Sequence, residues 1–214
     1  MPQNLTSQML DAVRAADGRV MDRPAYHADA AALRADPDMV GDVWKLERSQ
    51  VFYEEGDPAW QAFLANDWKR VLEIFESERP ALHEGIATYT RQGLRLRRLR
   101  VVENPLTPYL RWEMQSHRVF VECGYEIGVL EAEAVRQHEH RSPLPELMVY
   151  GRRVIYHVRY DDRWAPAGAK RIDDPVLANW AADFVSGLYA RSQPFLDFFH
   201  REVGTAAPAS AGGD

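Results

Sequence analysis

The chain has 214 residues, 46% of them hydrophobic and 27% charged, which predicts a globular protein with a core of ordinary size. Its formal net charge is −6, and this acidity argues against a chain-wide electrostatic attraction to nucleic acid. Cys123 is the single cysteine, so no internal disulfide can form.

The first 42 residues are predicted to form a helical or irregular arm. Apolar residues at helical spacing from Leu5 to Ala16 predict a first helix, which Gly18 ends. The sequence that follows is rich in alanine and aspartate, and a short helix is expected over residues 29–34. This amino-terminal segment lacks the basic start and apolar run of a signal peptide, and no stretch approaches the ~20 apolar residues that span a bilayer. We therefore expect a cytoplasmic location and no membrane partner.

A weak strand pattern over residues 43–53 is followed by a helical region that ends at Gly93. Asp57 is predicted to cap the start of a helix, and Pro58 suits its first position. Apolar residues spaced three and four apart, beginning with Trp68, then mark one buried helix face.

The segment from Gly93 to Met114 is predicted to be a strand, a turn and the start of an amphipathic helix. Leu99 and Val101 share one face of the strand, and Arg98 and Arg100 share the other. Strand-to-helix turns of this kind often present binding groups in α/β proteins.

The rest of the chain alternates strands and helices. A strand is predicted over residues 125–130, and the alternating pattern over residues 147–160 predicts a hairpin. Helices are predicted over residues 131–140, after Asp174 and after Pro194.

Together these elements predict an α/β protein of mixed α+β type, with a central sheet and flanking helices. We expect a helical arm at residues 1–42 and a single α/β domain at residues 43–203. Residues 204–214 are mostly small, and they are predicted to be a disordered tail because they cannot bury enough apolar surface to become ordered.

The predicted strand carries an unusually dense run of arginine. On one interpretation, arginines that alternate along a strand face bind phosphate or carboxylate groups bidentately. On the other, the positive charge belongs to a solvated or edge strand and discourages edge-to-edge pairing. The first interpretation predicts an anion-binding site formed by Arg98, Arg100, Tyr109 and Arg111.

Three acid–base candidates belong to the same part of the chain: Tyr109, Glu113 and Glu126. Neighbouring arginines lower the pKa of a carboxyl group, and a carboxylate of low pKa is a poor general acid at neutral pH. A structural network of ion pairs is therefore the competing interpretation of these residues.

We predict no metal site and no cofactor. His138 and His140 are two residues apart, so on a helix they point to different faces. The carboxylate of Glu122, next to Cys123, disfavours a reactive thiolate. The sequence contains no nucleophile elbow, phosphate-binding loop or dinucleotide-binding turn.

From about residue 43 to residue 199 the chain resembles an actinobacterial family of unknown function, family 6879. The shared blocks, in order, are RLRVVENPLTPYLRWEM, CGYEIGVL, LMVYGRRVIYHVRYDD and DDPVLANWAADF. The resemblance implies genes that often lie beside helix-turn-helix regulators, and a remote likeness to phospholipase D-like folds. The HxK motif of those enzymes is missing, because His140 is followed by Arg141 and Ser142. The resemblance therefore implies no activity.

Two functions remain open at this point. The first is a non-catalytic regulatory or ligand-binding protein that holds an anionic small molecule or a protein partner, such as a helix-turn-helix regulator. The alternative is an enzyme of unrecognised type that acts on a small metabolite, for example in secondary-metabolite biosynthesis, with Glu113, Glu126 or Tyr109 as acid–base groups. Direct binding to duplex DNA is not expected, because no helix with a basic face is predicted.

Overall fold

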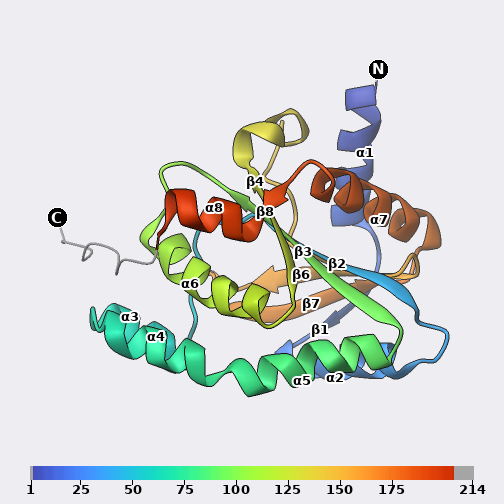
Figure 1. Cartoon of the computed structure of the whole chain (residues 1–214). Helices are drawn as coiled ribbons and strands as arrows, with labels where there is room; N and C mark the ends of the chain where they lie inside the picture. The colour runs from blue at the N-terminus through green and yellow to red at the C-terminus, as the bar shows by residue number, and fades with distance from the viewer. Residues whose placement is uncertain (1, 205–214) are drawn as a thin grey trace.

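The computed structural model describes residues 2–204 of the chain. This part forms one eight-stranded sheet with helices on both faces (Figure 1), which confirms the predicted mixed α+β class. Apart from Gly204, the predicted disordered tail lies outside the described residues. None of the described helices has the length and apolar character needed to cross a membrane.

The sheet has a parallel centre and antiparallel flanks. Its neighbouring strands follow the order β1-β7-β6-β5-β2-β3-β4-β8, in which only the β2–β3 and β3–β4 pairs are parallel. The strands are β1 (Arg19–Met21), β2 (Gly41–Glu47), β3 (Leu94–Val102), β4 (Glu126–Glu131), β5 (Leu147–Tyr150), β6 (Val154–Tyr160), β7 (Pro166–Ile172) and β8 (Gln193–Pro194).

Side-chain caps and first-turn prolines start most of the helices. Aspartate or threonine accepts a backbone N–H bond at the start of α2, α3, α4, α6 and α7. The α-helices are α1 (Pro2–Ala15), α2 (Arg23–Ala35), α3 (Pro58–Leu64), α4 (Trp68–Ser77), α5 (Arg79–Arg91), α6 (Pro108–Glu122), α7 (Pro175–Tyr189) and α8 (Phe195–Glu202).

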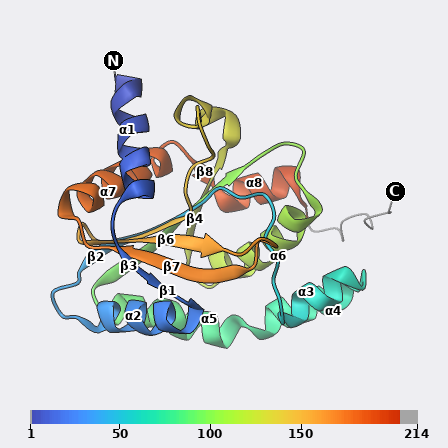
Figure 2. The same cartoon turned by 180° about the vertical axis from the view of Figure 1, so that it is seen from behind.

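The two faces of the sheet bury different side chains because strand residues alternate in direction. Leu99 and Val101 pack with the apolar side chains of α1 and α7 on one face. The helices α2, α5 and α6 lie on the opposite face, as Figures 1 and 2 show. Arg98 and Arg100 point to that second face, as their alternation with Leu99 predicts.

The segment predicted as an arm packs against the sheet. β1 pairs with β7 at the edge of the sheet, with Arg19 opposite Arg171. Leu33 of α2 is buried with Val43 of β2, and Leu10 of α1 packs against α7. A domain boundary at residue 42 stays a prediction.

Two local predictions have different outcomes. The hairpin over residues 147–160 is confirmed by the antiparallel pairing of β5 and β6 around Gly151. The helix over residues 131–140 is wrong, because this segment forms two short 3₁₀ turns. The carboxylate of Glu139 accepts bonds from Arg48 and from the backbone of Leu144, and these tertiary contacts compete with a continuous helix.

Candidate functional site

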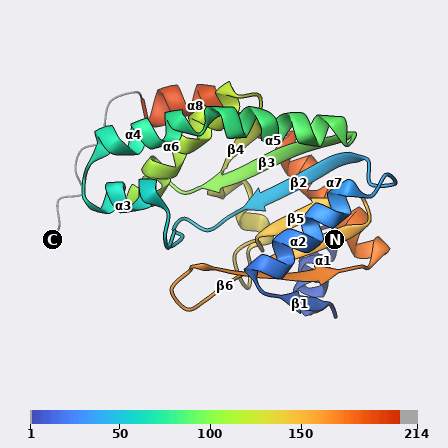
Figure 3. The ribbon, with the colours of Figure 1, turned by 90° about the horizontal axis from the view of Figure 1, so that it is seen from below.

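A cavity of about 620 Å³ lies on the face of the sheet that carries Arg98. Its walls come from α2, α5 and α6 and from strands β2, β3, β5 and β6. Figure 3 shows α2 and α5 on either side of β2 on this face. The charged side chains that line the cavity are Arg23, Arg34, Lys45, Glu47, Glu54, Asp57, Glu78, Arg98, Glu113 and Glu146.

Strand pairing and helix periodicity place the central side chains. In the parallel register Lys45 lies opposite Arg98, and Glu47 lies opposite Arg100. Thr107 accepts the backbone N–H of Leu110 and so starts α6. Residues four apart on a helix share a face, so α6 presents Tyr109, Glu113 and His117 together to the sheet.

Arg100 and Glu113 form a buried ion pair. Arg100 is 0% exposed, and its Nε donates to Glu113 Oε2 at 2.7 Å. Burial alone would lower the pKa of Arg100, but the carboxylates of Glu113 and Glu47 outweigh it and raise that pKa. Arg100 Nη1 donates to the carbonyl oxygen of Val101 at 3.1 Å. Arg100 is thus held as a permanent cation behind the cavity wall.

Tyr109 links two carboxyl groups. Its hydroxyl lies 3.2 Å from Glu113 Oε1 and 3.0 Å from Glu54 Oε1. A hydroxyl carries one proton, so it can donate to only one of these oxygens at a time. Burial, followed by the charge of Glu113, raises the pKa of Glu54. Tyr109 therefore holds the carboxyl groups of Glu54 and Glu113 close together.

A second charged group surrounds His117. Arg98 Nη1 donates to His117 Nε2, and Arg98 Nε lies 3.5 Å from Glu47 Oε2. Burial, followed by the charge of Arg98, holds the pKa of His117 well below its usual value. The imidazole is thus neutral, and because Nε2 accepts a bond, Nδ1 carries the hydrogen. Burial opposes ionisation of Glu47, but Arg98 and Lys45 outweigh it and lower its pKa.

Glu146 is a buried carboxyl group that the sequence analysis missed. Its Oε1 accepts the backbone N–H groups of Arg48 and Ser49 at 2.8 and 2.6 Å. Burial, followed by the charge of Glu47, raises the pKa of Glu146 to about 7. One feature of the sequence points to its burial: this charged residue directly precedes the strand LMVY, which has no charged residue.

Three buried polar atoms at the cavity have no hydrogen-bond partner among the described residues: Glu47 Oε2, His117 Nδ1 and Glu146 Oε2. Two of these atoms are acceptors, and His117 Nδ1–H is a donor. A buried polar atom without a partner costs about 1–3 kcal/mol. A molecule that supplied the complementary groups would recover part of that cost.

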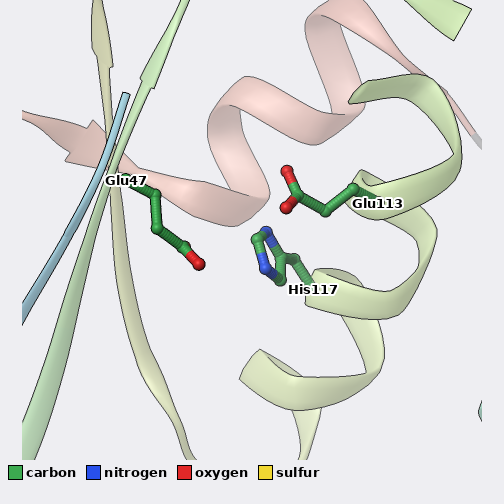
Figure 4. Close-up of side chains that lie close together, drawn as sticks. All are labelled: Glu47, Glu113 and His117. Atoms are coloured by element: carbon green, nitrogen blue, oxygen red, sulfur yellow. The ribbon is translucent and has the colours of Figure 1, made fainter. Parts of the chain in front are cut away.

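Glu47, Glu113 and His117 place possible metal-ligand atoms within 4.8 Å of one another (Figure 4). Each of them is already engaged by a cation: Glu47 by Lys45, Glu113 by Arg100 and His117 by Arg98. Two carboxylates and one imidazole suit a divalent metal, but these three cations offset the negative charge, and Arg98 occupies the accepting nitrogen of His117. The arrangement therefore does not favour a metal.

The structure brings some of the predicted site residues together and separates others. Arg98, Arg100, Tyr109 and Glu113 meet at the cavity, and of these Arg100 lies behind its wall. Arg111, half-buried on α6, does not line the cavity.

Glu126 also lies outside the cavity. Its carboxylate accepts hydrogen bonds from Arg95 Nη2 at 2.8 Å and from Arg97 Nε at 3.4 Å. Arg97 in turn stacks over Trp44, which packs with the α7 face of the sheet. Glu126 therefore belongs to an ion-pair network. The edge-strand interpretation of the arginine run is wrong, because β3 lies between β2 and β4.

The fold and the cavity define a mixed α+β protein with a charged internal site. The pattern of a family described as a domain of unknown function, DUF6879, matches residues 31–200. The match covers most of the chain, and the chain belongs to this family. No curated protein and no solved structure was found to match it.

Proposed function

We propose that this protein is a non-catalytic, ligand-binding regulatory protein that holds a small molecule with an anionic group in the cavity. The observation that carries the proposal is the set of buried polar atoms at the cavity that lack a hydrogen-bond partner among the described residues, on Glu47, His117 and Glu146. Small-molecule sites are concave and combine apolar walls with a few converging polar groups. Trp112 and Phe120 provide such walls here.

Cations that line the cavity support the anionic character of the ligand. Arg34 takes part in no ion pair among the described residues, and its Nη1 donates to the hydroxyl of Tyr150 at 3.0 Å. Arg98 and Lys45 already form ion pairs with Glu47. Arg34 is therefore the cation best placed to meet an incoming carboxylate or phosphate.

A thermal-shift screen against anionic metabolites and nucleotides tests the proposal. A ligand at about 100 times its Kd stabilises a one-site protein by ~2.7 kcal/mol, which raises Tm by several degrees. Ser116→Phe places a ring in the cavity from α6, so we expect it to abolish the shift. Ser77→Phe makes the same change at an exposed site on α4 and should leave the shift intact. A shift that survives Ser116→Phe would place the ligand elsewhere.

An enzyme is the second candidate, and Glu146 is the observation that favours it. A general acid or base works best when its pKa is close to the working pH. The raised pKa of Glu146, about 7, meets that condition inside a cavity. Mass spectrometry of a metabolite panel incubated with the protein tests this function. A compound consumed by the wild type but not by Glu146→Gln would support it, and an unchanged panel would exclude those compounds as substrates.

The regulatory part of the proposal includes a protein partner, such as a helix-turn-helix regulator. Its support is the resemblance to an actinobacterial family whose genes often lie beside such regulators. We propose a cytoplasmic role, for example in secondary metabolism, on the same ground. Co-purification of the tagged protein with a regulator encoded nearby tests the partner, and its absence from repeated pull-downs would contradict it.

A further inference from the structure

We propose that the cavity selects a dipolar ligand, with its anionic group toward Arg34 and a cationic amine toward Glu54, Asp57 and Glu78. This inference rests on the proposed function and names the class of molecule that the site takes. It comes from the distribution of unpaired charge along the cavity, which is acidic at one end and basic at the other.

The acidic end lies where β2 continues toward α3 and where α4 meets α5. Among the described residues, no lysine or arginine forms an ion pair with Glu54, Asp57 or Glu78, although ion pairs engage most glutamates of the fold. Burial, followed by the charge of Asp57, raises the pKa of Glu78. Three carboxyl groups therefore face one another across this end without a cation.

The basic end lies at α2. Arg34 donates to Tyr150 and stacks over the ring of Tyr89 at 5.5 Å, so its guanidinium meets aromatic groups instead of a carboxylate. Arg23 lines the same end and has no ion-pair partner among the described side chains. These two cations lower the pKa of His27, after the larger effect of its burial.

The two ends are separated along β2. Val43, near the start of the strand, packs with Leu33 of α2 next to Arg34. Glu47 ends the strand, and the chain leads from there to Glu54. At a rise of about 3.3 Å per residue, Val43 and Glu47 are on the order of 13 Å apart. Figure 3 likewise shows α2 toward one end of this face and α3 and α4 at the other.

The interior between the ends can hold a polar or apolar spacer. Glu146, which is 8% exposed, and His117 both line the cavity, and among the described residues Glu146 Oε2 and His117 Nδ1 have no hydrogen-bond partner. An amino acid with its amine on a terminal carbon, or a short peptide that extends by up to ~3.5 Å per residue, carries a carboxylate and an ammonium at opposite ends of a spacer. Such a ligand satisfies both charged ends, whereas a simple anion leaves the carboxyl groups unpaired.

Calorimetric titration with matched probes tests this inference on the full chain. The probes are aminobutanoate, aminohexanoate and aminooctanoate, each with a terminal amine, together with the carboxylates and amines of the same chain lengths. We expect at least one amino acid to bind about tenfold more tightly than both of its singly charged analogues, which corresponds to about 1.4 kcal/mol. Equal affinity of the carboxylate and the amino acid at every length would overturn the inference.

Charge-neutral variants assign the two ends. We expect Arg34→Gln to weaken binding of the amino acid and of the carboxylate but not of the amine. We expect Glu54→Gln to weaken binding of the amino acid and of the amine but not of the carboxylate. Glu54→Gln keeps an acceptor for Tyr109, and Arg153→Gln and Glu84→Gln are matched controls at exposed ion pairs outside the cavity. Equal effects of both cavity variants on every probe would overturn the assignment. The proposed function fails separately, if Ser116→Phe leaves all binding intact.

Discussion

Replacing Glu113 with glutamine should destabilise the protein strongly, because it leaves Arg100 charged and unpaired in the core. Removing one partner of a buried ion pair typically costs about 3–5 kcal/mol. Arg100 is 0% exposed, but in the variant its Nη1 still donates to the carbonyl oxygen of Val101, and Glu47 still supplies negative charge. We therefore expect the lower end of that range, about 3 kcal/mol, and a fall in Tm of roughly 10 °C.

Urea unfolding at neutral pH measures this loss, with Glu122→Gln as the matched control. Glu122 lies on the same helix and pairs with Arg118 at 2.8 Å, but its side chain is 33% exposed, so its loss should cost below about 1 kcal/mol. The double variant Arg100→Met, Glu113→Gln should recover a large part of the stability, since it removes the unpaired cation. A cost for Glu113→Gln no greater than that of the control would refute the buried pair.

Three further predictions concern pH, helix capping and metal binding. The pKa of Glu146 rises from 4.5 to about 7 on folding, so the folded state holds this proton more tightly and stability falls as pH rises through that window. In Glu146→Gln this fall, at most about 3 kcal/mol, should be absent when urea unfolding is compared at the two ends of the window. Asp174→Ala removes the acceptor for two backbone N–H groups at the start of α7 and should cost about 1 kcal/mol by the same method. Arg98→Met removes the cation that bonds to His117 and pairs with Glu47, so we expect the variant to bind cobalt. Bound cobalt would be detected by absorption in the visible range that the wild type lacks.

Local patterns in the sequence were enough to place part of the site. The alternation of Leu99 and Arg100 sets which face of β3 is charged, and the four-residue spacing of Tyr109 and Glu113 sets the facing side of α6. Both patterns depend on neighbours in the sequence, so no knowledge of the tertiary fold was needed. The same reasoning could not show that Glu126 points away from the cavity, because the register of β4 against β3 places it beside Arg97, and no local pattern encodes that register.

The missed residues depend on contacts between distant segments. Glu47 reaches the site because β2 pairs in parallel with β3, a register that no local pattern encodes. Glu146 is held by the backbone of Arg48 and Ser49, far away in the sequence. The strands β1 and β7 were not predicted, because β1 has three residues and β7 carries Gly168 and charged side chains.

The way in which α2 is attached has a consequence for how a ligand enters. This helix connects β1, which pairs with β7 over three residues at the edge of the sheet, to the central strand β2. Hydrogen bonds from Tyr156 and Arg171 to Asp29 hold it in place. Leu33 packs in the core, and Arg34 bonds to Tyr150. Release of these contacts would free the basic wall of the cavity while the parallel strands stay paired. Opening of this segment should therefore require less free energy than global unfolding, which gives the ligand a route in and out of a folded protein.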